Sequence, residues 1–224
     1  MNAPLPYARA LRLDGAMSPA ELAFLYDVAR SMPEDALVVE VGSFKGRSSV
    51  AICEGLSQVP GARFVAVDPW RRIRMTDSEL YEPGAPDEDE IYRRFVRNTG
   101  PYDFVKPMRM TSLEAAPEFA DASVDWLFVD GDHSFDAVRA DLRAWYPKVK
   151  LLGLVSGHDH TWFDVRWAVA SHARSVSVWD SIWHFRKTRP SLGTRPLPLL
   201  VGTARKALRR APAVERGVRA LRAR

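Results

Sequence analysis

Short, continuous apolar runs alternate along the chain with stretches that have helical spacing. Apolar runs of about 4–8 residues, bounded by turn residues, are typical of strands buried on both faces of a parallel sheet. The runs of this kind predict strands at 37–41, 63–67, 104–108, 124–129 and 151–156, and a β-rich pair follows at 175–179 and 182–185. Because helical patterns lie between them, we expect an α/β fold with a mainly parallel seven-stranded sheet and helices on both faces.

The helical patterns begin and end at recognisable signals. Ser18, followed by Pro19 and Glu21, predicts a capping box at the start of the first helix, and Pro33 ends that helix. Later helices are predicted at 46–56, 134–145 and 162–172. Tryptophans within the apolar patterns are expected in the core, and these are Trp126, Trp167 and Trp179.

The connection between the second and third predicted strands, residues 71–100, is long and rich in proline and acidic residues. A short helix is expected within it at 90–98. Connections in α/β folds are usually shorter, so this insertion is a candidate lid or acceptor-binding loop. The alternative is a solvated surface excursion without a role.

Composition places the chain among ordinary globular proteins of one medium domain, since it has 224 residues and 27% charged residues. A single cysteine, Cys53, excludes an intrachain disulfide and is compatible with a reducing compartment. The first residues do not resemble a secretory signal, and no apolar run approaches the roughly 18 residues of a membrane span. We therefore expect a cytoplasmic protein.

Charge divides the chain into two parts, a main domain over 1–187 and a tail over 188–224. From residue 186 onward there are 12 Lys and Arg residues and one acid, whereas acids exceed bases in the remainder. The tail contains basic amphipathic helical patterns, which suit weak contact with an anionic membrane surface or an acidic partner. A partly disordered, solubilising tail is the simpler reading.

A glycine-containing turn follows the first predicted strand. Its pattern, Glu40-x-Gly42-x-x-x-Gly46, differs from the dinucleotide motif G-x-G-x-x-G and from the phosphate-binding P-loop. A ligand can approach the bare backbone there and face the N–H groups of the next helix. Roughly 26 residues after Gly42, Asp68 ends the second strand, where a carboxylate can bind ribose hydroxyls. A small zwitterionic ligand with a ribose fits both features.

Ionisable side chains follow the fourth and fifth predicted strands. They are Asp130, Asp132 and His133 after the fourth, and His158, Asp159 and His160 after the fifth. Neighbouring parallel strands end at one edge, so these groups should converge, and they then need a metal or shared protons. Taken singly, Asp132 and Ser134 could simply cap the following helix.

Four segments resemble the class I S-adenosylmethionine-dependent methyltransferases: VEVGSFKGRSS, VAVDPW, FVDGDHSFDAVRADLRAWYPKVKLLG and SGHDH, within residues 36–162. They are most similar to the metal-dependent O-methyltransferase branch that methylates antibiotic sugars and polysaccharides. The resemblance implies a Rossmann-like sheet and S-adenosylmethionine as cofactor. It also implies a hydroxyl acceptor, with sugars favoured, and a homo-oligomer.

The resemblance further implies roles for individual residues. The cofactor would be bound by Glu40, Gly42, Ser43, Gly46, Ser48, Asp68, Thr111, Ser112 and Asp130. A divalent metal, with Mg²⁺ favoured, would be held by Asp130, His158 and Asp159, although the family more often has an acid or amide at the position of His158. The general base would be His133 or Asp132, with His160 as a third candidate.

Two other classes of function compete with this hypothesis. One is a nucleic-acid methyltransferase anchored by the basic tail, but the main domain is acidic and lacks an Asn-Pro-Pro-Tyr-like motif, so no nucleic acid is expected. The other is a non-catalytic protein that keeps the cofactor fold. The charged residues at two strand ends argue against it, because a lapsed enzyme has no reason to keep repelling charges together.

Overall fold

The structure is a computed structural model that describes residues 5–70 and 88–188. The chain divides into two compact units, Met1–Ser191 and Leu192–Arg224, and every described residue belongs to the first. The tail from 189 onward, and residues 71–87 of the predicted insertion, lie outside the described residues.

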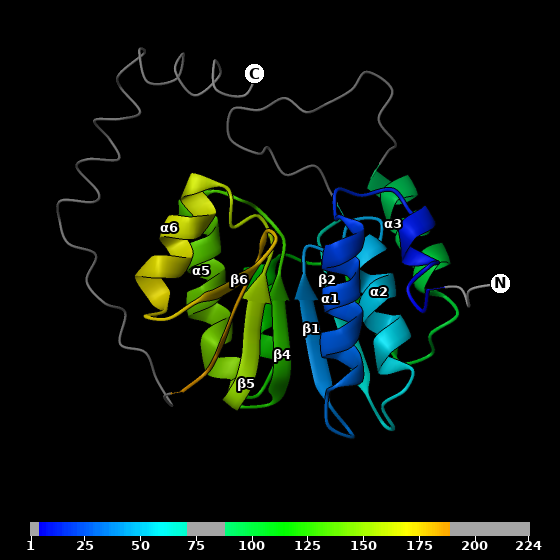
Figure 1. The fold of residues 1–224 in the computed structure, drawn as a ribbon, viewed down its shortest axis with the longest axis horizontal. Coiled ribbons are helices and arrows are strands. Elements are labelled where there is room, and N and C mark those ends of the chain that lie inside the picture. Colours follow the sequence, from blue (N-terminus) through cyan, green and yellow to red (C-terminus); the bar gives the residue numbers. More distant parts are fainter. Residues whose placement is uncertain (1–4, 71–87, 189–224) are drawn as a thin grey trace, which may run out of the picture. The chain divides into compact units, whose positions relative to one another are not determined.

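A seven-stranded sheet forms the centre of the first unit (Figure 1). Its strands are β1 (Leu37–Val41), β2 (Arg63–Val67), β3 (Val105–Met108), β4 (Val124–Val129), β5 (Val149–Gly157), β6 (Ser177–Trp179) and β7 (Ile182–Arg186). Their order is β3-β2-β1-β4-β5-β7-β6, and only β7 runs antiparallel to its neighbours. The predicted α/β class and mainly parallel sheet are confirmed.

Helices cover both faces of the sheet, as expected (Figure 1). One face carries α1 (Pro19–Arg30), α2 (Arg47–Leu56) and α3 (Glu88–Thr99), and the other carries α5 (Phe135–Trp145) and α6 (Phe163–His172). A short α4 (Ser112–Ala115) and 3-10 turns at Ala10–Arg12, Ala116–Glu118 and Tyr146–Lys148 were not predicted. The helix within the insertion, α3, lies close to its predicted place.

The first helix forms as its sequence predicts. Ser18 and Glu21 make both hydrogen bonds of the capping box, and the apolar stripe of α1 is buried. The stripe packs on α2, where Gly55 permits close approach, because a Cβ there would lie 2.5 Å from the Tyr26 carbonyl oxygen. The α1–α2 layer is thus set by local sequence on both helices.

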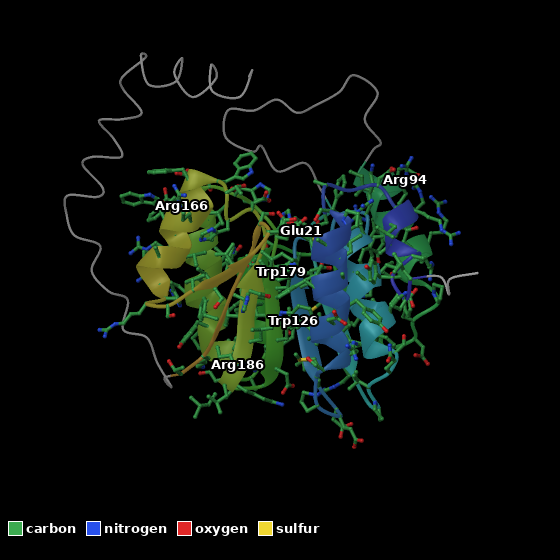
Figure 2. All side chains as sticks on the ribbon, in the orientation of Figure 1. Glu21, Arg94, Trp126, Arg166, Trp179 and Arg186 are labelled. Atoms are coloured by element: carbon green, nitrogen blue, oxygen red, sulfur yellow. The ribbon has the colours of Figure 1, made fainter. Side chains whose placement is uncertain are left out.

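Two expectations are corrected. Trp126 is fully buried, but Trp179 is 55% exposed; both are labelled in Figure 2. Trp179 lies on β6, a three-residue strand at the edge of the sheet, where Phe24 of α1 stacks against its ring with centroids 6.5 Å apart and leaves the rest of the side chain exposed. The fifth strand also begins at Val149 rather than at 151, because the buried Val149 pairs with Val124 of β4 ahead of an irregularity in the pairing. Within the described ranges, every helix is too short or too polar to cross a membrane.

A buried lysine directly after β7, Lys187, binds the segment that leads into β5, and this contact gives a first prediction. The Lys187 ammonium donates to the backbone carbonyls of Tyr146 (2.9 Å), Pro147 (3.3 Å) and Val149 (2.7 Å). Lys187→Met should lower the free energy of unfolding by about 2–3 kcal/mol, because charged hydrogen bonds are lost and carbonyls are left unpaired. Urea unfolding measures it. Lys148→Met, which loses one ion pair to the exposed Asp121, is the control and should cost about 0–1 kcal/mol. Equal losses of unfolding free energy in the two variants would show that the hydrogen bonds of Lys187 contribute no more than an exposed ion pair.

Candidate functional site

The loops that follow four strands lie side by side because the parallel hydrogen bonding continues past the strand ends. Gly42 N–H donates to the Val67 carbonyl (2.8 Å), and Asp130 N–H donates to the Val41 carbonyl (2.7 Å). In the same way His158 N–H donates to the Val129 carbonyl (3.1 Å). The predicted site residues therefore share the carboxyl edge of the sheet.

The glycine turn has a backbone that only glycine adopts easily. Gly42 has φ +90°, and a Cβ there would lie 2.3 Å from the Asp130 carbonyl oxygen, so the turn packs directly on the loop after β4. Gly46, at φ +86°, is the N-cap of α2 and has no side chain to satisfy the first N–H groups of that helix. Those N–H groups and the helix dipole suit a carboxylate ligand.

Asp68 holds the glycine turn in place. One of its carboxylate oxygens accepts from Phe44 N–H (2.8 Å) and the other from Trp70 N–H (2.6 Å). The buried Trp70 in turn donates its indole N–H to the Phe44 carbonyl (2.7 Å). Burial raises the pKa of Asp68, and the backbone N–H groups oppose that rise. The backbone N–H of Ser43 also acts on this carboxylate, and the acceptor capacity that remains keeps ribose binding compatible with the anchoring role.

Unsatisfied polar atoms lie beneath the turn. Glu40 is fully buried; Ser49 donates its hydroxyl to one carboxylate oxygen, while Oε1 has no partner within the part of the chain described. The Ser43 hydroxyl, also buried, makes no well-aligned hydrogen bond there, although it lies near enough to Glu40 to act on its carboxylate. Burial raises the pKa of Glu40 to about 7, against the effect of the hydroxyls of Ser48, Ser49 and Ser43. Native proteins rarely leave such atoms unpaired, so they point to a polar ligand.

The two residues predicted beside the adenine form local structure. Thr111 is the N-cap of α4 and makes a capping box with Glu114. The Ser112 hydroxyl accepts from the indole N–H of Trp145 (2.8 Å), which ties the loop after β3 to α5. Contact of either residue with the cofactor stays a prediction.

Asp141, buried on α5 near Ser112, gives a prediction about pH. Burial raises its pKa from 3.8 to about 6, with the Ser112 hydroxyl opposing. A folded-state pKa above the unfolded value means that the folded protein loses stability as pH rises from about 4 through 6. Asp141→Asn should therefore be as stable as the wild type at pH 4 and up to about 3 kcal/mol more stable at pH 8. Urea unfolding at both pH values measures it, with Asp136→Asn on the same helix as control. A difference that is the same at both pH values would contradict it.

Four of the predicted side chains converge into one cluster. His133 Nε2 lies 2.8 Å from an Asp159 carboxylate oxygen and 3.8 Å from one of Asp130. His158 Nδ1 lies 3.1 Å and 3.6 Å from the same two carboxylates. Ligand atoms of Asp130, His133 and Asp159 all lie within 4.8 Å of one another, a spacing that can hold a metal ion. The predicted convergence of β4 and β5 is thus observed.

Electrostatics within the cluster are strongly coupled. Burial lowers the pKa of both histidines, but the adjoining carboxylates outweigh it and raise the pKa of His133 to about 10 and that of His158 to about 9. Burial raises the pKa of Asp130. For Asp159 the two histidines overcome burial and hold the pKa well below its usual range. Without a cation, the histidines themselves neutralise the carboxylates.

Asp132 and His160 are placed differently from the cluster. An Asp132 carboxylate oxygen accepts from Ser134 N–H (2.7 Å), and Ser134 is the N-cap of α5, so Asp132 shapes the turn that starts this helix. His160 follows the β5 loop, where its backbone N–H donates to the Ser181 carbonyl (3.0 Å). Of the three candidate bases, only His133 contacts the two carboxylates.

Sequence reasoning missed one member of the site. Glu21, predicted only as a capping-box residue, also reaches His158, with 3.0 Å between Glu21 Oε1 and His158 Nε2. Figure 2 shows Glu21 at the edge of the sheet toward which the strands point. The contact spans 137 residues, so no local pattern could have indicated it.

Comparisons with known proteins agree with this geometry. Residues 39–160 match a family described as a methyltransferase domain. The uncharacterized protein y4gI of Sinorhizobium fredii is 33% identical over 157 residues, which are 69% of this chain; the chain spans only 15% of that curated relative.

Two solved structures share the fold. The first is an S-adenosylmethionine-dependent O-methyltransferase from Thermotoga maritima, with a TM-score of 0.59 at 12% identity, covering 87% of this chain and 74% of the other. The second is the O-methyltransferase NovP, with a TM-score of 0.56 at 16% identity, covering 76% of this chain and 80% of the other.

Proposed function

Since the chain belongs to the family of methyltransferase domains and has the class I methyltransferase fold, we propose that it is an S-adenosylmethionine-dependent O-methyltransferase. The acceptor is a hydroxyl of a sugar or another small molecule. One observation carries the proposal: the glycine turn with its unsatisfied Glu40 and Ser43 lies beside the Asp130–Asp159 cluster on one sheet edge. A cofactor and an activated hydroxyl can therefore meet there.

The residues of the glycine turn fit S-adenosylmethionine. The first N–H groups of α2, together with Ser48, suit its carboxylate, and Glu40 and Ser43 can pair with its ammonium or ribose. Asp68 keeps acceptor capacity for the ribose hydroxyls, and Gly42 leaves the backbone open to close approach. Bound cofactor supplies the electrophilic methyl group.

The cluster fits a divalent metal. His133 Nε2 is a buried nitrogen that lies against two carboxylates yet makes no aligned hydrogen bond within the described residues. Asp130, Asp159 and His158 Nδ1 would hold the ion, with Mg²⁺ favoured, and His133 is near enough to substitute as a ligand. A bound divalent ion would lower the pKa of an acceptor hydroxyl and offset the carboxylate charges that raise the pKa of His133.

His133 can accept the proton that the acceptor hydroxyl loses during methyl transfer. The hydroxyl oxygen attacks the methyl carbon, the carbon–sulfur bond breaks, and the hydroxyl proton passes to His133, which lies on the more exposed side of the cluster. The half-exposed indole of Trp162 lies against His133, with ring centroids 5.3 Å apart. It offers a flat apolar surface for a ring-shaped acceptor.

Calorimetry of S-adenosylhomocysteine binding tests the cofactor site. The intact protein should bind, and Asp68→Ala should lose binding, because the turn loses its anchor and the ribose its acceptor. Asp27→Ala, on the exposed part of α1 where Asp27 pairs with Arg30, is the control and should bind as the wild type does. An intact, folded protein that does not bind the ligand would overturn the proposal.

The reaction class needs its own test. Release of S-adenosylhomocysteine from S-adenosylmethionine should be measured with panels of sugars and catechols, with and without Mg²⁺ after EDTA treatment. Turnover on a hydroxyl acceptor is expected. Cofactor binding with methyl transfer only to amines or nucleic acid would reassign the enzyme's substrate.

A further inference from the structure

Glu21 has two functions that are usually separate. In a capping box, the glutamate needs only one oxygen, and here Oε2 accepts from Ser18 N–H (2.7 Å). The other oxygen, Oε1, accepts from Ser181 N–H (3.2 Å) and from the Ser181 hydroxyl, and it faces His158 Nε2. The residue is 3% exposed, although capping-box glutamates normally lie at the surface. The burial of Glu21 is therefore explained by the contacts of Oε1 with Ser181 and His158, outside the helix, rather than by the capping box.

The His158 ring is held at both nitrogens. Nε2 lies 3.0 Å from Glu21 Oε1 and 3.0 Å from the Ser181 hydroxyl, whereas Nδ1 faces Asp159 and Asp130. The backbone is fixed too, since the His158 carbonyl accepts from the indole N–H of Trp183 (3.0 Å). The ring therefore cannot turn without breaking contacts to four elements of the fold.

The partner on Nε2 decides what Nδ1 can do. A carboxylate only accepts hydrogen bonds, so the Glu21 contact requires a proton on Nε2. In the neutral ring, Nδ1 then carries a lone pair directed at the two carboxylates. That is the arrangement of a metal-binding histidine whose other nitrogen donates to an outer carboxylate.

We propose that Glu21 is a positioning residue that fixes the orientation and tautomer of His158, so that Nδ1 faces the Asp130–Asp159 cluster as a metal ligand. This role rests on the proposed function, because it requires a metal ion at the Asp130–Asp159 cluster. It also links the start of α1 to the site, since Ser18 and Glu21 both contact the β6–β7 turn, Ser18 through a hydrogen bond to Asp180 (2.9 Å).

The first readout does not depend on metal binding. Nitrogen-15 NMR of the intact protein should show a His158 Nε2–H resonance in slow exchange, identified by its loss in His158→Gln. In Glu21→Gln that proton should exchange at least about 10-fold faster, because the amide has a single, uncharged acceptor oxygen in place of the two carboxylate oxygens that serve Ser18 and His158. In Ser18→Ala, which disturbs the same cap but leaves Glu21 on His158, it should persist. A wild-type spectrum without this proton would overturn the proposal.

The second readout is Mn²⁺ binding, followed by the electron paramagnetic resonance signal of the free ion. Glu21→Gln should weaken Mn²⁺ binding by about 10- to 100-fold, as loss of an outer-shell partner does, while S-adenosylhomocysteine binding is kept. Ser18→Ala should bind Mn²⁺ as the wild type does. Equal losses in both variants, or none in Glu21→Gln, would reduce Glu21 to a helix cap. Failure of the wild type to bind S-adenosylhomocysteine would instead count against the proposed function.

Discussion

Gly42→Ala should abolish binding of S-adenosylhomocysteine and lower the free energy of unfolding by about 3 kcal/mol or more. Two costs add. Gly42 has φ +90°, a conformation that alanine adopts only with strain, and the new Cβ would lie 2.3 Å from the Asp130 carbonyl oxygen and 2.6 Å from the Gly131 Cα. Backbone cannot yield as a flexible side chain can, so the loops after β1 and β4 must separate. Calorimetry and urea unfolding measure the two effects.

Gly131→Ala is the matched control, because it is a glycine of the same junction with ordinary space around it. A Cβ at Gly131 would meet only Val41 Cγ1 at 3.7 Å, an ordinary contact distance. This variant should fold and bind S-adenosylhomocysteine within a few-fold of the wild type. If Gly42→Ala also bound normally, the close contact between the two loops would not be needed for the cofactor site.

Asp130→Asn should weaken Mn²⁺ binding by more than about 100-fold, because loss of an outer-shell partner alone already costs about 10- to 100-fold. Asp130 presents its carboxylate to both histidines of the cluster and is one of the two acids on which any ligand set depends. Electron paramagnetic resonance of free Mn²⁺ during titration of EDTA-treated protein measures the affinity. Asp121→Asn, at the opposite end of β4, is the control and should bind normally.

Substitutions of the two histidines separate metal binding from catalysis. His158→Gln should lose Mn²⁺ binding, whereas His133→Gln should mainly lose turnover. Unchanged Mn²⁺ affinity in Asp130→Asn would show that the cluster is an ion-pair network rather than a metal centre.

Many of the site residues could be predicted from the sequence because they directly follow the ends of strands. A parallel strand buried on both faces is recognisable from its apolar run, and the residues after such runs must share one edge of the sheet. Gly42, Asp68, Asp130 and His158 were located in this way. The pairing of Asp68 with Phe44 and Trp70 was not, since those hydrogen bonds depend on the path of a turn whose positive φ angles the letters do not specify.

The layered α/β fold, the capped first helix and the edge at which the ionisable residues meet could all be predicted from sequence, because they follow from short-range periodicity and from the fixed direction of parallel strands. The contacts among those residues could not be predicted and were seen first in the three-dimensional structure. His133 contacts Asp159, whereas the neighbouring Asp132 accepts from Ser134 N–H at the start of α5. Glu21 contacts His158, which is 137 residues away in the sequence. Such contacts depend on how helices and loops pack in three dimensions, and a one-dimensional pattern carries no record of that packing.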